Sequence, residues 1–549
     1  MSDPRPPADD RLRLSTPGGR WVLVAAVLGS AVVSLDATVV NVALPTIGRD
    51  FEARVSGLQW TVNGYSLTLA ALILLGGSLG DRFGRRRVFV IGVIWFGAAS
   101  LLCGLAPNLT TLILARALQG IGGALLTPGS LAMISASFHP DDRARAIGAW
   151  SGLGGVAGAI GPLIGGALLD LSWRLVFLIN LPMTALVVML AMRHVPESMD
   201  LQAPRKLDFA GAAAGAIGLG GLTYALIEAP DHGLSGVSLP ALIGVAALAG
   251  FIAIERRSSH PLIPLDIFTS RQFTAANLVT FALYAALGSV FFLMAITLQV
   301  SVGLSPLLAG ASLLPLTLIM LVLSARAGAL AGRVGPRRPM TFGPLIVAVA
   351  LLLMLRIGPG SGYLTDILPA VIILGLGLSL TVAPLTAAVL AAAKTRHAGV
   401  ASGVNNAVAR TAGLLAVAVL PIVMGLSGDD YQRPVPLAHG FHLAMSWCAG
   451  LVALSAVIAW FGIRDDVLAT SATLPASIPP SGPGAPAADL PPTAAAAARP
   501  ATAPNAAAPQ ATSPHTTTPQ ATSPNAAAAP AETYHCSLNG PPPPDPAQR

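Results

Sequence analysis

The sequence predicts an all-α integral membrane protein with fourteen transmembrane helices, and three observations support this prediction. The composition is apolar and poor in charge. Stretches long enough to cross a bilayer recur along most of the chain. An internal repeat divides twelve of these stretches into two halves of six helices, which leaves two helices as an insert between the halves.

The composition excludes a soluble globular protein. Of 549 residues, 54% are hydrophobic and only 10% are charged, whereas soluble domains carry about 25% charged residues. The 57 glycines are typical of membrane helices whose backbones approach each other closely at small residues. We therefore expect the chain to lie in a lipid bilayer for most of its length.

The expected spanning helices are stretches of ~20 mostly apolar residues. They cover residues 21–43, 58–78, 88–105, 111–134, 146–169, 174–193, 209–228, 238–254, 273–300, 306–330, 340–356, 365–391, 401–426 and 440–462. The first stretch is longer than the apolar region of a signal peptide, and further spans follow it, so we expect no cleavage.

The basic residues predict the orientation of the chain. With both termini in the cytoplasm, the inside segments up to Arg464 carry 22 Lys and Arg residues and the outside loops carry five. Such a bias toward the cytoplasmic side is general among membrane proteins, and it explains the net charge of +7 without nucleic acid as a partner. The Ala-, Pro-, Gly- and Arg-rich composition indicates a bacterial genome. We expect a multi-pass protein of the bacterial plasma (inner) membrane with both termini cytoplasmic.

The repeat sets the boundaries of the expected segments. Residues 77–86 match residues 328–337 at Gly, Leu, Arg, Gly and Arg with an offset of 251, and the same offset relates Gly148 to Gly399. Parallel halves of this kind enclose a cavity at the membrane midplane. A tail of Ala, Pro and Thr cannot form a core and is expected to be disordered. The five segments are a cytoplasmic N-terminal segment (1–20), an N-terminal six-helix half (21–193), two inserted helices with flanking loops (194–272), a C-terminal six-helix half (273–463) and the cytoplasmic tail (464–549).

Asp36 is the most informative residue of the sequence. Among the carboxylates of the expected spans it alone lies well inside, about seven residues or ~10 Å from the outer end. A charged carboxylate at that depth is costly, and ionisable groups inside membranes are functional by default. Asp36 is therefore a candidate proton carrier. The alternative is a carboxylate that is permanently paired for packing.

Three arginines lie inside the expected spans and not at their terminal residues. Arg116 is ~8 Å from the outer end of its helix, a depth close to that of Asp36, so it is a candidate partner for that carboxylate. Arg410 lies mid-span, where it binds either an anionic group or helix carbonyls. Arg326 lies near an inner helix end and is expected to extend its charged group to the membrane surface.

Small residues crowd the fifth expected helix. They are Gly154, Gly158, Gly161, Pro162, Gly165 and Gly166. Glycines at spacings of three and four residues allow a close seam between two helices, and a Gly-Pro pair favours a bend.

Together these motifs resemble the major facilitator superfamily, and within it the fourteen-helix branch of drug:proton antiporters, which export drugs and natural products. The loop at residues 77–86 resembles the superfamily's motif between helices 2 and 3. Residues 35–45 resemble the helix 1 signature of this branch, residues 114–120 its helix 4 motif, and residues 154–166 its helix 5 antiporter motif. The resemblance covers nearly everything from about residue 20 to residue 463.

The resemblance implies roles for these residues. Asp36 and Arg116 would couple protons to transport, and the seam of the fifth helix would govern alternating access. A cytoplasmic gate would comprise Gly77, Asp81, Arg82, Gly84, Arg85 and Arg86. The second repeat departs from the pattern because Gly332 stands where the first has Asp81, so we expect a charged latch on one side only.

Substrate contacts are expected at the midplane between the halves. Polar residues of the spans that are candidates for such contacts are Gln59, Asn63, Tyr65, Asn277, Gln299, Asn405 and Arg410. Each of them can equally bridge helices. The surrounding Gly, Ala and Leu residues favour an apolar ligand.

The resemblance favours a proton-coupled antiporter that exports a small amphipathic organic compound by alternating access. The alternative is a proton-coupled carrier dedicated to one endogenous metabolite, because a fold does not determine a substrate. An enzyme is not expected, since the sequence has no Walker loop and no His, Cys and carboxylate cluster with metal-ligand spacing. We expect no cofactor or metal, a proton gradient as the energy source, and no ATP or nucleic acid as a partner. The sequence does not reveal the oligomeric state, and a monomer is compatible with it.

Overall fold

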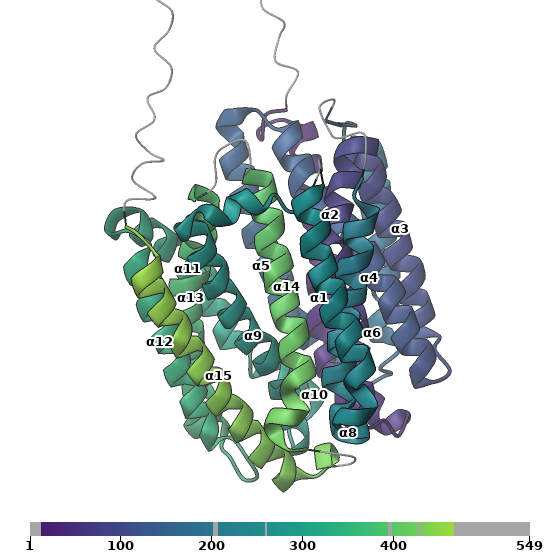
Figure 1. Cartoon of the computed structure of the whole chain (residues 1–549), viewed down its shortest axis with the longest axis vertical. Coiled ribbons are helices and arrows are strands. Elements are labelled where there is room, and N and C mark those ends of the chain that lie inside the picture. The colour runs from purple at the N-terminus through teal and green to yellow at the C-terminus, as the bar shows by residue number, and fades with distance from the viewer. Residues whose placement is uncertain (1–11, 201–206, 259–260, 393–397, 427–429, 466–549) are drawn as a thin grey trace, which may run out of the picture. The chain divides into compact units, whose positions relative to one another are not determined.

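The computed structural model describes residues 12–200, 207–258, 261–392, 398–426 and 430–465. These residues are mostly helical, and thirteen of their helices are long and apolar enough to cross a membrane. The predicted all-α membrane class is confirmed (Figure 1). Residues 1–11 of the expected cytoplasmic segment and the expected tail from residue 466 lie outside the described residues.

The helices follow one another with short connections. The first half contains α1 (Pro17–Asp50), α2 (Val55–Phe83), α3 (Arg85–Gly104), α4 (Leu109–Ser137), α5 (Pro140–Leu169), α6 (Leu175–Leu178) and α7 (Asn180–His194). After α8 (Phe209–Arg257), the second half contains α9 (Arg271–Val300), α10 (Pro306–Ala311), α11 (Leu314–Val334), α12 (Arg337–Leu353), α13 (Leu368–Ala391), α14 (Ala398–Met424) and α15 (Pro434–Gly462).

Several helices begin where the sequence supplies a cap. Thr16, Asn108, Ser270 and Ser305 each accept a hydrogen bond from the backbone N–H three residues further on. Such caps satisfy N–H groups that the first turn of a helix leaves unpaired. The caps explain why α1, α4 and α9 begin before the apolar stretches that predicted them.

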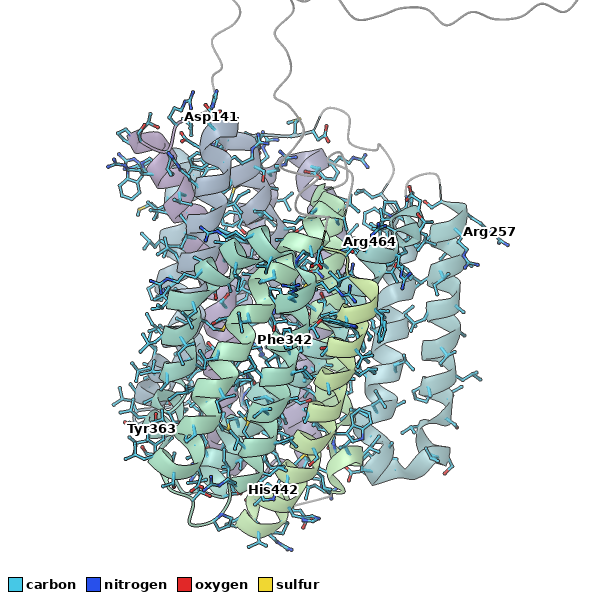
Figure 2. The ribbon with its side chains drawn as sticks, turned by 90° about the vertical axis from the view of Figure 1, so that its left-hand side faces the viewer. Asp141, Arg257, Phe342, Tyr363, His442 and Arg464 are labelled. Carbon is cyan, nitrogen blue, oxygen red and sulfur yellow. The ribbon has the colours of Figure 1, made fainter. Side chains whose placement is uncertain are left out.

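The helix α8 is a hairpin of two antiparallel arms. It is 49 residues long, and Gly233 within it has a φ of 68°, which is not helical. A Cβ at Gly221 would lie 2.9 Å from the Cα of Gly244, so the two arms pack backbone against backbone. Figure 2 shows the hairpin, with Arg257 at the end of its returning arm. With these arms counted separately, the spans are consistent with the fourteen that the sequence predicts.

The two ends of the helix bundle carry different residues. Asp141, Arg257 and Arg464 lie toward one end in Figure 2, and Tyr363 and His442 lie toward the other. We call the first the terminal end, because α1 begins and α15 ends there, and the second the opposite end. The residues that the positive-inside rule assigns to the cytoplasm therefore share one end of the bundle.

Glycines set the spacing between neighbouring helices. At the contact of α3 with α4, a Cβ on Gly122 would lie 2.7 Å from the backbone nitrogen of Phe96, and one on Gly92 would lie 2.9 Å from that of Leu126. Small residues allow such close approach in membranes, where dispersion contacts and hydrogen bonds hold helices together. This seam places α4, which carries Arg116, directly against α3.

We predict that Gly122→Ala lowers the stability of the purified protein, although Ala is the better helix former by about 1 kcal/mol. The added methyl group has no space against α3, and overpacking costs about 1–3 kcal/mol. Thermal unfolding in detergent measures the effect. The matched control is Gly250→Ala, whose Cβ meets no described atom within 4 Å and which should melt at or above the wild-type temperature. Equal melting temperatures for the two variants would contradict the close seam.

Candidate functional site

A buried ion pair lies inside the first half. Arg116 on α4 donates from Nη1 to Oδ2 of Asp36 on α1 over 2.6 Å, and the two side chains are 1% and 0% exposed. The structure thus brings together two charged residues whose similar depth was predicted from the sequence, but whose directions around their helix axes were not.

Asp36 lies deeper than the sequence analysis expected. The helix α1 continues through Pro45 and ends at Asp50, 14 residues beyond Asp36, or about 21 Å along the helix. The predicted span stopped at residue 43 and gave ~10 Å, because polar residues after Pro45 ended the apolar stretch. Asp36 therefore occupies the middle of α1, and the last turns of α1 extend past the start of α4.

Two amide side chains complete the surroundings of the Asp36 carboxylate. Gln119 donates from Nε2 to Oδ1 over 2.8 Å, and Asn180 donates from Nδ2 to the same oxygen over 3.0 Å. Arg116 in turn donates from Nε to the carbonyl of Thr61 over 3.2 Å. A buried ion pair is tolerated when further hydrogen bonds satisfy both partners, and that condition is met here.

The network extends to two more helices. Ser100 on α3 accepts from Asn180 Nδ2 over 2.9 Å and from Gln119 Nε2 over 3.1 Å. The guanidinium carbon of Arg116 lies 4.3 Å from the ring centroid of Tyr65 on α2. The sequence analysis assigned no role to Ser100, Gln119 or Asn180. One signal was available, since Gln119 follows Arg116 by three residues and so lies on the same helix face.

The expected seam of α5 is formed in part. A Cβ on Gly165 would lie 2.8 Å from Cγ1 of Val39, and one on Gly161 would lie 3.1 Å from Cβ of Thr38, both on α1. Gly158 has only an ordinary contact with α1. The seam therefore joins α5 to the helix that carries Asp36.

The helix α5 also joins the two halves near the opposite end. A Cβ on Gly166 would lie 2.5 Å from Cα of Leu307, and one on Gly310 would meet the carbonyl of Pro162. Toward the terminal end, a Cβ on Gly154 would have no described atom within 4 Å. Of the six small residues, Gly166 and Pro162 thus contact the second half.

Two glutamines also cross between the halves near the opposite end. Gln59 on α2 donates to the carbonyl of Val417 on α14, and Gln299 on α9 donates to the carbonyl of Val42 on α1 over 2.9 Å. At the terminal ends of α5 and α11, a Cβ on Gly148, Gly152 or Gly332 would meet no described atom within 4 Å. The halves therefore contact each other at the opposite end, whereas these glycine faces of α5 and α11 are open at the terminal end.

The expected gate residues form local contacts at the terminal end of the first half. Arg85 donates from Nη2 to Oδ1 of Asp81 over 2.8 Å, one turn apart. The guanidinium of Arg82 lies 5.0 Å from the ring centroid of Phe83. Gly77 makes an ordinary contact with Pro128 of α4.

A carboxylate that the sequence analysis missed lies beside the gate. Glu197 accepts at Oε1 from the backbone nitrogen of Arg86 over 3.0 Å, and its Oε2 lies 3.7 Å from Nε of Arg86. It thereby caps the start of α3. A Cβ on Gly84, whose φ is 105°, would lie 2.7 Å from Oε1 of Glu197, so this position requires glycine.

The second half repeats this cap but not the neighbouring ion pair. Asp465 accepts at Oδ1 from the backbone nitrogen of Arg337 over 3.2 Å, beside Gly335, whose φ is 82°. Gly332, which replaces Asp81, offers no charge. Asp465 follows the end of α15 by three residues, just as Glu197 follows α7. This common spacing was the signal in the sequence that could have identified both acids.

The candidate substrate residues divide into bridging and free groups. Gln59 and Gln299 join the halves, and Tyr65 lies against Arg116. Asn405 donates from Nδ2 to Asn277 Oδ1 over 3.2 Å and to Thr280 Oγ1 over 2.8 Å, which joins α14 to α9. Within the described residues, Asn63 is buried with neither amide atom hydrogen-bonded. Arg410 is partly exposed, without a hydrogen bond or ion pair to the described part of the chain.

We predict that Arg116→Gln destabilises the protein by about 3–5 kcal/mol, because it leaves the Asp36 charge buried without its partner. The double variant Asp36→Asn with Arg116→Gln removes both charges and should be more stable than Arg116→Gln alone. Thermal unfolding of wild type, both single variants and the double variant measures the coupling between the two side chains. A double variant that loses the full sum of the two single effects would contradict a coupled pair.

Comparison with known proteins places this geometry in a family. A family model for the Major Facilitator Superfamily matches residues 26–418. The chain is 36% identical over 481 residues to a puromycin resistance protein of Streptomyces alboniger, which covers 84% of this chain and 95% of that protein. It is also 36% identical over 406 residues to the multidrug resistance protein Stp of Mycobacterium tuberculosis, which covers 73% of this chain and 75% of that protein.

A solved structure shows the same fold. The chain matches a bacterial homologue of the human lysosomal transporter Spinster, in an inward-facing and unoccupied conformation, with a TM-score of 0.60. The match has 18% sequence identity and covers 83% of this chain and 98% of that structure. From the family match and these likenesses, we conclude that the chain belongs to the Major Facilitator Superfamily and is a multi-pass membrane transporter, not an enzyme.

Proposed function

We propose that this transporter is a proton-coupled antiporter that exports a small amphipathic organic compound, such as an antibiotic, from the bacterial cytoplasm. The observation that carries the proposal is the buried Asp36–Arg116 pair, which puts a titratable carboxylate in the middle of an apolar helix. Relatives named for resistance to puromycin and to multiple drugs support an organic compound as the substrate.

Proton binding at Asp36 would act on the packing of α1. A proton on this carboxylate removes the charge that Arg116 faces, and hydrogen bonds between ionised groups are about twice as strong as neutral ones. The contact between α1 and α4 therefore weakens on protonation. The change lies at the interface of the halves, because α1 accepts from Gln299 of α9 at the carbonyl of Val42. It also lies next to α5, which packs against α1 at Gly165 and contacts α10.

The arrangement of the halves supports alternating access. The terminal end carries Arg257 and Arg464, which the positive-inside rule assigns to the cytoplasm, so a parting of the halves at that end would open the central site to the cytoplasm. Outward opening would require the contacts of Gly166 with Leu307 and of Gln299 with Val42 to break. Such rocking of one half against the other is the usual mode of this class of fold.

We predict that Asp36→Asn abolishes gradient-driven efflux and reduces it to the level of cells without the protein. The amide keeps the shape of the carboxylate but cannot carry a proton. The measurement is the efflux of puromycin and a panel of lipophilic dyes from cells that lack their own exporters, with and without an uncoupler. Asp170→Asn, at an exposed position where α5 ends, is the matched control.

Three results would count against the proposal. Wild-type activity of Asp36→Asn at equal protein levels would make Asp36 structural. Efflux that persists after collapse of the proton gradient would exclude proton coupling. A wild type that moves no compound of the panel would favour a carrier dedicated to one metabolite.

A further inference from the structure

Arg410 lies at the midplane between the two halves. Two contacts between α14 and α2 set its level: a Cβ on Gly403 would lie 3.2 Å from Leu74, and the carbonyl of Val417 accepts from Gln59. On α14, Arg410 is midway between these two contacts, at Gly403 and Val417. It is therefore level with the middle of the α2 segment between the partner residues Gln59 and Leu74. Tyr65 lies in that middle part of α2.

The part of α14 that carries Arg410 packs against helices of both halves. Besides its contacts with α2, it lies against α9, where a Cβ on Gly288 would lie 2.8 Å from the Cα of Gly413. Arg410 itself is partly exposed. These observations place a positive charge between the halves at the depth where transporters of this fold bind substrates.

Arg410 has no counter-charge in the described part of the chain. A guanidinium offers five N–H donors, and arginines inside membranes are almost always paired or face a water-filled cavity. Arg410 makes no hydrogen bond or ion pair with the residues described. Its side chain is therefore free to bind a group that is not part of the chain.

The intramembrane carboxylates nearby are already engaged. Asp36 accepts from Arg116, Gln119 and Asn180, and its charge is balanced by the arginine. Glu228, toward the opposite end, accepts from Nε1 of Trp60 over 2.8 Å. The midplane between the halves therefore carries one unbalanced positive charge, at Arg410.

We propose that Arg410 binds the acidic group of the exported compound, a carboxylate or phenolate on an aromatic body, and that the transporter prefers such acids to cations of the same size. That the bound acid is an exported substrate rests on the proposed export function. Binding of the acid to Arg410 does not depend on transport and can be measured on the purified protein. An anion gains charge-assisted hydrogen bonds from Arg410 in a site of low dielectric, whereas a cation meets an uncompensated like charge there.

The test compares three fluorescent probes with one ring system: pyrenebutyric acid, its carboxamide and pyrenebutylamine. Binding to the purified full-length protein in detergent is followed by fluorescence anisotropy, without a proton gradient. Wild type should bind the acid at least about tenfold more tightly than the amine, and Arg410→Gln should reduce this preference to about twofold or less. Arg410→Lys should keep part of the preference, because it keeps the charge. Arg326→Gln, which removes an exposed arginine of α11, should keep all of it.

Each outcome decides the proposal. Wild type that binds the amine as well as the acid, or that fails to bind the acid, overturns it without any variant. An acid preference that survives in Arg410→Gln also overturns it. If Arg410→Gln does not fold, the proposal is decided by the acid preference of wild type and by whether Arg410→Lys keeps part of that preference. If proton-driven efflux fails but the acid preference is intact, the antiporter proposal is wrong and the Arg410 proposal stands. If efflux is proton-driven but the acid preference is absent, the Arg410 proposal is wrong and the antiporter proposal stands.

Discussion

The cost of burying two charges inside a membrane helix constrains the arrangement of the whole first half. Asp36 and Arg116 are tolerated there because the carboxylate accepts hydrogen bonds from Arg116, Gln119 and Asn180, and Arg116 also donates to the carbonyl of Thr61. Those partners come from different helices: Ser100 from α3, Gln119 from α4 and Asn180 from the start of α7. A shift of one helix would leave a buried charge unsatisfied. The first half is therefore expected to move as a unit, which rocking of the two halves requires.

The two halves share their end structures and differ in their charges. Glu197 and Asp465 cap corresponding helices beside a glycine of positive φ, so the repeat is preserved where it shapes the loops. The first half has a neutralised pair between α1 and α4. In the second half α9, which corresponds to α1, instead has the neutral contacts of Asn277 and Thr280 with Asn405 of α14, and Arg410 lies mid-span without an ion pair to the described residues. Under the two proposals, proton chemistry and recognition of an anion would belong to different halves.

The sequence predicted the class of the fold, the repeat and the two residues of the central pair, because these depend on composition and depth. Apolar length reveals a spanning helix, and a carboxylate inside one is rare enough to identify Asp36. The depth of a residue does not show the direction in which its side chain points around the helix axis. The roles of Gln119 and Asn180 were missed for this reason. The length of α1 was underestimated because the helix continues after Pro45 through the buried Ile47 and Gly48 to the exposed, charged Arg49 and Asp50, and these charges end the apolar stretch. Glu197 was missed because it caps a helix through backbone nitrogens, and the only signal for it was its distance of three residues from the end of α7, which Asp465 repeats after α15.

The two proposed sites also have a common electrical consequence. Tyr65 lies against the guanidinium of Arg116, and Arg410 on α14 is level with the part of α2 that carries Tyr65, so the proposed proton site and the proposed anion site lie at a similar depth. Exchange of one proton inward for one anion outward moves two charges in the same electrical direction. With a negative cell interior, each of these charges gains about 2.3 kcal/mol per 100 mV. Exchange of a proton for a monovalent cation is electroneutral and gains nothing from the potential. With an acidic substrate, the proposed antiporter would therefore move two charges down the membrane potential in each cycle, in addition to using the pH gradient.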